Sequence, residues 1–180
     1  AAKKRGEKSM DLRLPGEFLP TVSESRFEID LGNWVLATAV AQLDTWRSAG
    51  IATRMSVNIS ARHLVHPDFV PHLRRVLGAH PELDPSLLQL EVLESTTLGD
   101  LTSIARIMAA CNDLGVSFAI DDFGTGYGSM SSLRRLPVRS IKIDRSIIHN
   151  MLDDADDLAT VQSMIGLAAA FHREVIAEGV

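Results

Sequence analysis

Five short runs of β-forming residues alternate with longer segments of helical periodicity, and this alternation constrains the fold of the 180-residue chain more than any other feature. Repeated strand–helix units predict a parallel sheet covered by helices. Glycine or proline follows several of the helical segments, as is typical of helix ends. The expected strands are 55–59, 88–93, 116–121, 140–144 and 174–178, and the expected helices are about 29–49, 68–79, 100–114, 129–136 and 156–171.

Size and charge limit the classes of function. With 46% hydrophobic residues the chain can bury a single core. Its formal net charge of −5 disfavours non-specific binding to DNA or RNA, which needs a basic face. No apolar run approaches the roughly 18 residues of a membrane span, so we expect no direct membrane contact and a cytoplasmic location, with an anchor elsewhere in a parent protein left open. We expect residues 1–14 to form a polar, poorly ordered segment and residues 15–180 to form the domain.

Cysteine, histidine and tryptophan residues often mark catalytic, metal or ligand sites, but in this sequence they are predicted to have structural roles. Cys111 lies on an apolar helical stripe and is expected to be a buried, inert thiol. His63 and His66 are predicted to be a surface or partly buried pair rather than a metal site. Trp34 and Trp46 are predicted to pack in the core or between helices rather than to stack on bases.

Each expected strand carries near its end a polar residue that is unusual in a core. In a barrel of parallel strands, side chains at the carboxyl ends converge on one mouth. Oxygen-bearing side chains without sulfur favour Mg²⁺ or Mn²⁺ over zinc. A lysine among them can stabilise an attacking hydroxide or a phosphate charge, or simply form a salt bridge to Asp144 or another carboxylate. The residues are Asn58, Glu91, Asp121 with Asp122, Lys142 with Asp144, and Glu178.

The stretch FAIDDFGTGYGSM places Asp121 and Asp122 side by side after an apolar run, where their charges repel. If Asp121 bridges two metal ions and Asp122 binds the second, this repulsion becomes attraction, and the ions can act on both oxygens of a phosphodiester displacement. The glycines that follow allow close approach to a ligand. For this motif alone a solvated turn is the alternative, as are surface positions for Asn58, Glu91 and Glu94 taken singly. Only the joint pattern favours a site.

The motifs LGNWVL, VNIS, LEVLES, FAIDDFGTGYGS, LPVRSIKIDRSII and VIAEGV resemble, in this order, the EAL domain of bacterial cyclic di-GMP phosphodiesterases. The resemblance implies an α/β fold, a TIM-like (β/α)8 barrel of the EAL type with one strand reversed. It also implies hydrolysis of cyclic di-GMP to linear pGpG with two Mg²⁺ or Mn²⁺ ions. The alternative is a catalytically inactive, degenerate EAL domain that binds cyclic di-GMP or a protein as a sensor. A homodimer formed through the region after DDFGTG and attached sensory or diguanylate cyclase domains are further implications of the resemblance.

The same resemblance implies a role for individual residues. Ligands of the first ion are Asn58, Glu91 and Asp121, and ligands of the second are Asp121, Asp122 and Glu178. The catalytic set is Lys142, which holds the water, with Asp122 and Glu178. Glu94 anchors the loop after the DD pair, and Asp144 supports the ligands from behind. The lid or dimer loop is Phe123, Gly124, Thr125, Gly126 and Tyr127.

The sequence also departs from the family pattern. Leu93 replaces a usual Thr, Gly128 a usual Ser and His63 a usual Gln, and none of these is an expected ligand. The Glu-Ala-Leu strand, which carries a further metal ligand, is not visible in residues 1–15, and the family usually continues past Val180 with a final strand and helix. We therefore expect an incomplete barrel and little or no activity for the chain as written.

Overall fold

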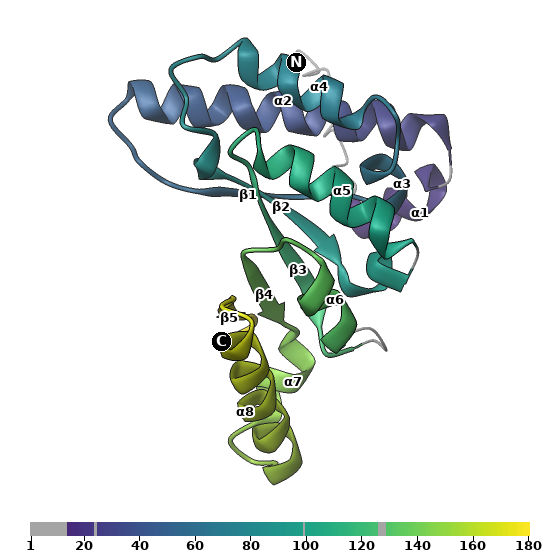
Figure 1. Ribbon diagram of the computed structural model, residues 1–180, viewed down its shortest axis with the longest axis vertical. Coiled ribbons are helices and arrows are strands. Elements are labelled where there is room, and N and C mark those ends of the chain that lie inside the picture. Colours follow the sequence, from purple (N-terminus) through teal and green to yellow (C-terminus); the bar gives the residue numbers. More distant parts are fainter. Residues whose placement is uncertain (1–13, 24, 99, 126–128) are drawn as a thin grey trace, which may run out of the picture.

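Five parallel strands form one sheet in chain order, β1-β2-β3-β4-β5 (Figure 1). The structure is a computed structural model and describes residues 14–23, 25–98, 100–125 and 129–180. All five predicted strands are present with small shifts at their ends, and the predicted α/β class is confirmed. The strands are β1 Met55–Asn58, β2 Leu88–Leu93, β3 Ser117–Phe123, β4 Ser140–Ile143 and β5 Glu174–Ala177.

Helices connect the strands and follow the order of the sheet, so that α2, α4 and α5 lie at one end of the molecule and α7 and α8 at the other (Figure 1). The five expected helices correspond to α2, α4, α5, α6 and α8, whereas α1, α3 and α7 were not expected. The helices are α1 Pro15–Val22, α2 Arg26–Ser48, α3 Ala61–Leu64, α4 Phe69–Gly78, α5 Leu101–Asn112, α6 Ser129–Arg135, α7 Arg145–Asn150 and α8 Ala155–Ala170, with the short 3-10 helices η1 Pro85–Leu87 and η2 Glu94–Leu98.

Local side-chain chemistry explains where the longer crossover helices begin and end. Asp100 accepts hydrogen bonds from the backbone N–H groups of Thr102 and Ser103 at the start of α5. Asp154 does the same for α8. These carboxylates satisfy donors that have no partner within the helix. Gly115 follows α5 with φ +91°, a left-handed conformation that favours glycine and reverses the chain towards β3.

The core lies between the sheet and its helices. Strand residues that alternate along β2, β3 and β4 point to the helices and are fully buried, among them Leu90, Phe118 and Ile141. Cys111 of α5 is buried there, so its predicted burial is confirmed, and burial raises the pKa of its thiol to about 12. The opposite face of the same strands carries polar residues, among them Gln89 and Lys142, because side chains alternate between the two faces along each strand.

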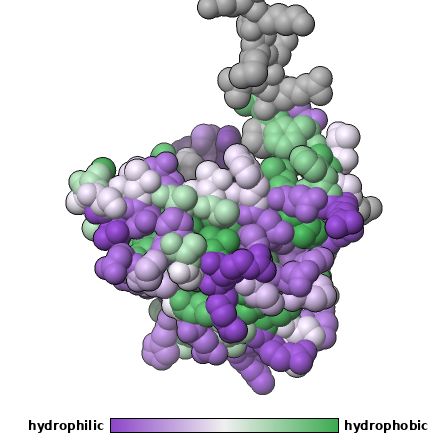
Figure 2. All heavy atoms as spheres, turned by 90° about the horizontal axis from the view of Figure 1, so that it is seen from above, coloured by the Kyte–Doolittle hydropathy of each residue, from purple (hydrophilic) through white to green (hydrophobic). Residues whose placement is uncertain are grey.

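Two tryptophans of α2 behave differently. Trp46 is partly buried and packs against the core, as predicted. Trp34 is 64% exposed, so its predicted burial was wrong. The side of α2 that faces the core passes through Leu36, Val40 and Leu43, and Trp34 lies off this stripe. Viewed over this end of the molecule, the surface is mainly hydrophilic with apolar side chains between (Figure 2).

No helix among the described residues is long and apolar enough to cross a membrane. The predicted poor order of the N-terminal segment concerns residues that lie outside the described ranges, except Leu14. Gly126 and Tyr127 of the expected lid loop, and Gly128, also lie outside them.

Candidate metal and catalytic site

Lys142 of β4 lies among three carboxylates at the carboxyl ends of the strands. Its Nζ is 2.9 Å from Glu91 Oε2, 2.9 Å from Asp121 Oδ1 and 2.7 Å from Glu178 Oε1. The lysine side chain is only 13% exposed. The strand-end residues therefore converge as the sequence predicts. Lys142 therefore forms the predicted salt bridges, and its partners are these three carboxylates rather than Asp144.

A distortion of β3 brings both neighbouring aspartates to this mouth. Adjacent residues of a regular strand point to opposite faces. The pairing of β3 with β4 shifts register between Ile120 and Phe123, and Asp122 has φ 54°, in the left-handed region that non-glycine residues rarely adopt. The backbone N–H of Asp122 donates to Asp121 Oδ1 at 3.1 Å. Carboxylate oxygens of Asp121, Asp122 and Glu178 consequently lie within 4.8 Å of one another.

The cluster is acidic beyond what Lys142 neutralises. Burial, followed by the charges of Asp121 and Asp144, raises the pKa of the Asp122 carboxyl. Burial disfavours the Lys142 ammonium, but its hydrogen bonds to Glu178, Asp121 and Glu91 outweigh this and raise its pKa above the ordinary value. The mouth thus already holds one cation and still carries carboxylates whose repulsion a second cation would relieve.

The donor set fits hard divalent cations. All of its charged members are carboxylates, and the amide of Asn58 stands at the end of β1, in register with Glu91 of β2. Oxygen ligands of this kind suit Mg²⁺ or Mn²⁺. The predicted ligands Glu91, Asp121, Asp122 and Glu178 are therefore brought together, while no hydrogen bond among the described residues joins the Asn58 side chain to these carboxylates.

Glu94 ties the segment after β3 to the end of β2. Its Oε2 accepts a hydrogen bond from the Gly124 backbone N–H at 3.0 Å, and Glu94 is 2% exposed. Gly124 has φ +103°, and a Cβ there would overlap the Met164 side chain of α8. Thr125 then turns back, since its hydroxyl donates to the carbonyl of Asp122 at 2.9 Å. This geometry agrees with the anchoring role expected for Glu94.

Asp144 stands behind the cluster at the start of α7. It accepts a hydrogen bond from the Ser146 backbone N–H at 2.9 Å, and its charge contributes, after burial and the charge of Asp121, to raising the pKa of the Asp122 carboxyl. Asp144 thereby acts on Asp122 through its charge, and its expected supporting role stays a prediction.

Comparison with known proteins extends these observations. The sequence model of the EAL domain family matches residues 5–180 of this chain. The bifunctional diguanylate cyclase/cyclic di-GMP phosphodiesterase MucR of Pseudomonas aeruginosa is 39% identical over 167 residues, which are 92% of this chain and 24% of MucR. The cyclic di-GMP phosphodiesterase PA2567 of the same organism is 33% identical over 92% of this chain and 28% of its own length. The chain thus spans about a quarter of the length of these relatives.

The fold also matches a solved structure. The structure described as PaMucR phosphodiesterase in complex with c-di-GMP superposes with a TM-score of 0.88 and 38% identity, covering 97% of this chain and 70% of the other. The parallel five-stranded sheet of this chain therefore corresponds to part of the TIM-like barrel of such structures.

Proposed function

The chain belongs to the EAL domain family, and on this premise we propose that it adds water across one phosphodiester bond of cyclic di-GMP to give linear pGpG. The observation that carries this proposal is the convergence of Glu91, Asp121 and Glu178 on Lys142, with Asp122 beside them. MucR and PA2567, which are named as cyclic di-GMP phosphodiesterases, support the choice of substrate.

Two Mg²⁺ or Mn²⁺ ions would be held by these oxygen ligands. Asn58, Glu91 and Asp121 are proposed for one ion, and Asp121, Asp122 and Glu178 for the other. Bound there, such ions supply Lewis-acid activation of water and stabilisation of phosphate charge.

The chain's own groups position the reactants. The Lys142 ammonium, held by three carboxylates, places a positive charge where an attacking water and a phosphate oxygen would meet. The hydrogen bond from Gly124 to Glu94 fixes the segment after β3 beside the mouth. Asp144, at the start of α7, adds negative charge near Asp122. Positioning of this kind contributes to the rate because it replaces chance encounter by a fixed geometry.

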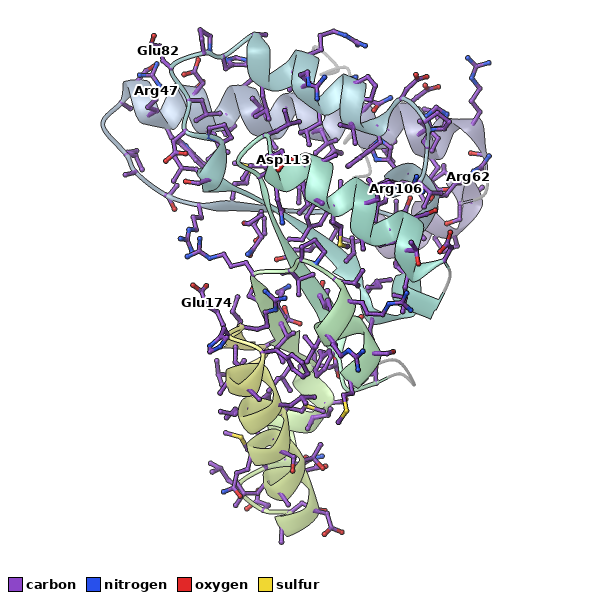
Figure 3. The ribbon with its side chains drawn as sticks, in the orientation of Figure 1. Arg47, Arg62, Glu82, Arg106, Asp113 and Glu174 are labelled. Carbon is purple, nitrogen blue, oxygen red and sulfur yellow. The ribbon has the colours of Figure 1, made fainter. Side chains whose placement is uncertain are left out.

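The experiment measures metal binding and turnover separately. Titration calorimetry with Mn²⁺ should show binding to the unaltered protein that weakens on the order of 100-fold in Asp121→Asn and in Asp122→Asn. Asp113→Asn, at the exposed residue that follows α5 (Figure 3), is the matched control and should bind Mn²⁺ unchanged.

Chromatographic separation of cyclic di-GMP from pGpG then decides the activity. Metal-dependent appearance of pGpG that is lost in Asp121→Asn supports the phosphodiesterase. Binding of cyclic di-GMP without pGpG supports the alternative, an inactive EAL domain that acts as a sensor. Unchanged Mn²⁺ binding in both aspartate variants would rule out the proposed ligands.

A further inference from the structure

A second polar layer lies directly below the residues of the mouth, on the same inner face of the sheet. Side chains two positions apart on a strand share a face. Three strands carry a polar residue two positions before a residue of the mouth, so that the lower layer repeats the upper one. The pairs are Ser56 below Asn58, Gln89 below Glu91, and Ser140 below Lys142.

The members of this lower layer are hydrogen-bonded to one another. Gln89 Nε2 donates to Ser140 Oγ at 3.1 Å, and the Ser56 hydroxyl lies 3.5 Å from Gln89 Oε1. Gln89 is 7% exposed and Ser140 is fully buried. Burying an amide and a hydroxyl is costly unless they are paired, so this contact is expected to persist.

The contact between Gln89 and Ser140 crosses a whole strand. Gln89 is on β2 and Ser140 on β4, and β3 lies between them. Ala119 of β3 is the register partner of Ser140 and is fully buried. Its small side chain leaves room for the bridge, which a larger residue at this position would obstruct.

A second bridge across β3 lies one layer above, between Glu91 Oε2 and Lys142 Nζ at 2.9 Å. Both bridges join the same two strands at positions two residues apart. A strand rises about 3.3 Å per residue, so even a fraction of one residue of slippage between β2 and β4 would break the upper contact. The lower bridge resists this slippage, and Ser56 extends the restraint to β1, which carries Asn58.

We infer that Gln89 and Ser140 are a positioning pair that holds Glu91 and Lys142 at the spacing required by the metal ions and substrate. The inference rests on the proposed function, because that function is what requires Glu91 and Lys142 to keep this spacing. Replacing both members of a buried hydrogen-bonded pair by apolar groups of similar shape is nearly neutral for stability. A merely structural role therefore predicts that such a double replacement leaves both stability and Mn²⁺ affinity unchanged. A positioning role predicts unchanged stability with weaker Mn²⁺ binding.

The test is the double variant Gln89→Leu/Ser140→Ala. Its melting temperature should stay within about 3 °C of the unaltered protein, while its Mn²⁺ dissociation constant should rise about 10-fold, as for residues that orient metal ligands. Ser140→Thr keeps the hydroxyl and should retain Mn²⁺ affinity. The control is Arg139→Gln/Glu174→Gln. It removes an ion pair between Arg139, which precedes β4, and Glu174, which begins β5 and is labelled in Figure 3, and it should leave Mn²⁺ affinity unchanged.

A metal-free measurement separates this inference from the proposed function. Hydrogen exchange of the Lys142 ammonium with water, followed by NMR, should be faster in Gln89→Leu/Ser140→Ala and unchanged in the control. If the unaltered protein binds no Mn²⁺, the proposed function fails, and the ammonium exchange alone decides the positioning role. Unchanged ammonium exchange in the double variant would overturn it. Loss of Mn²⁺ affinity to the same degree in the control would overturn it as well.

Discussion

Acidification should destabilise the protein through His63 of α3. This side chain is 2% exposed, its Nε2 lies 3.0 Å from Asn33 Oδ1, and its ring packs edge-on against Phe69 with centroids 4.9 Å apart. The expectation of a surface or partly buried pair was therefore wrong for His63. Burial lowers its pKa from 6.5 to about 4. Other titratable or charged groups that act on it or lie near it are His72, His66, Glu28 and Arg62.

The sign and size of the effect follow from this difference in pKa. Above pH 6.5 the imidazole is neutral in both the folded and the unfolded chain, so His63 adds no pH dependence there. As the pH falls from 6.5 to about 4, only the unfolded chain takes up the proton, and stability is lost across this window. The full difference corresponds to about 3 kcal/mol. Local relaxation that admits water should reduce this to about 1–2 kcal/mol.

Urea unfolding of the unaltered protein and of His63→Gln, at about pH 7 and about pH 4.5, measures this effect. Glutamine keeps a group able to hydrogen-bond Asn33 but does not titrate, so the stability difference between the two proteins should change by about 1–2 kcal/mol between the two pH values. His149→Gln on α7, an exposed position, is the control and should show no such change. Parallel pH dependence of His63→Gln and the unaltered protein would refute the argument.

Three further predictions concern the mouth. Lys142→Met should lower the metal-free unfolding free energy by about 3 kcal/mol, because it leaves three carboxylates without their cation, and added Mn²⁺ should restore part of this in urea unfolding. Glu94→Ala should speed amide exchange at Gly124 by roughly 10-fold or more and impair turnover, whereas Glu94→Gln keeps an acceptor and should stay close to the unaltered rate. Gly124→Ala should cost about 2 kcal/mol or more in thermal unfolding, because φ is +103° and the new Cβ would overlap Met164 and lie 2.8 Å from Ile147 Cδ1.

The strands could be predicted closely because their composition and spacing repeat, whereas three helices could not. α1, α3 and α7 have eight, four and six residues, too few for a helical period to stand out. The starts of α3 and α7 nevertheless carry capping residues. Ser60 accepts a hydrogen bond from the His63 backbone N–H at α3, and Asp144 accepts one from that of Ser146 at α7.

The candidate site could be predicted only as a set of strand ends. Convergence of parallel strands was enough to place Glu91, Asp121 and Glu178 at one mouth. The sequence did not predict which carboxylates Lys142 would contact, because that depends on the stagger between strands and on the bulge of β3. Gln89 was missed altogether. Its spacing of two residues from Glu91 was the available signal, but its bond to Ser140 depends on tertiary pairing.

The chain-order arrangement of the sheet has a consequence for assembly. Each strand joins only the edge left by the one before it, so pairing can proceed in the direction of synthesis without inserting a strand between two earlier ones. The carboxylates of the mouth are distributed along this path, and Glu178 follows β5. A ligand that needs all of them can be captured only after β5 has joined the sheet, and its binding then favours the folded chain by mass action. Occupancy of the mouth would thus report that strands β1 to β5 have paired.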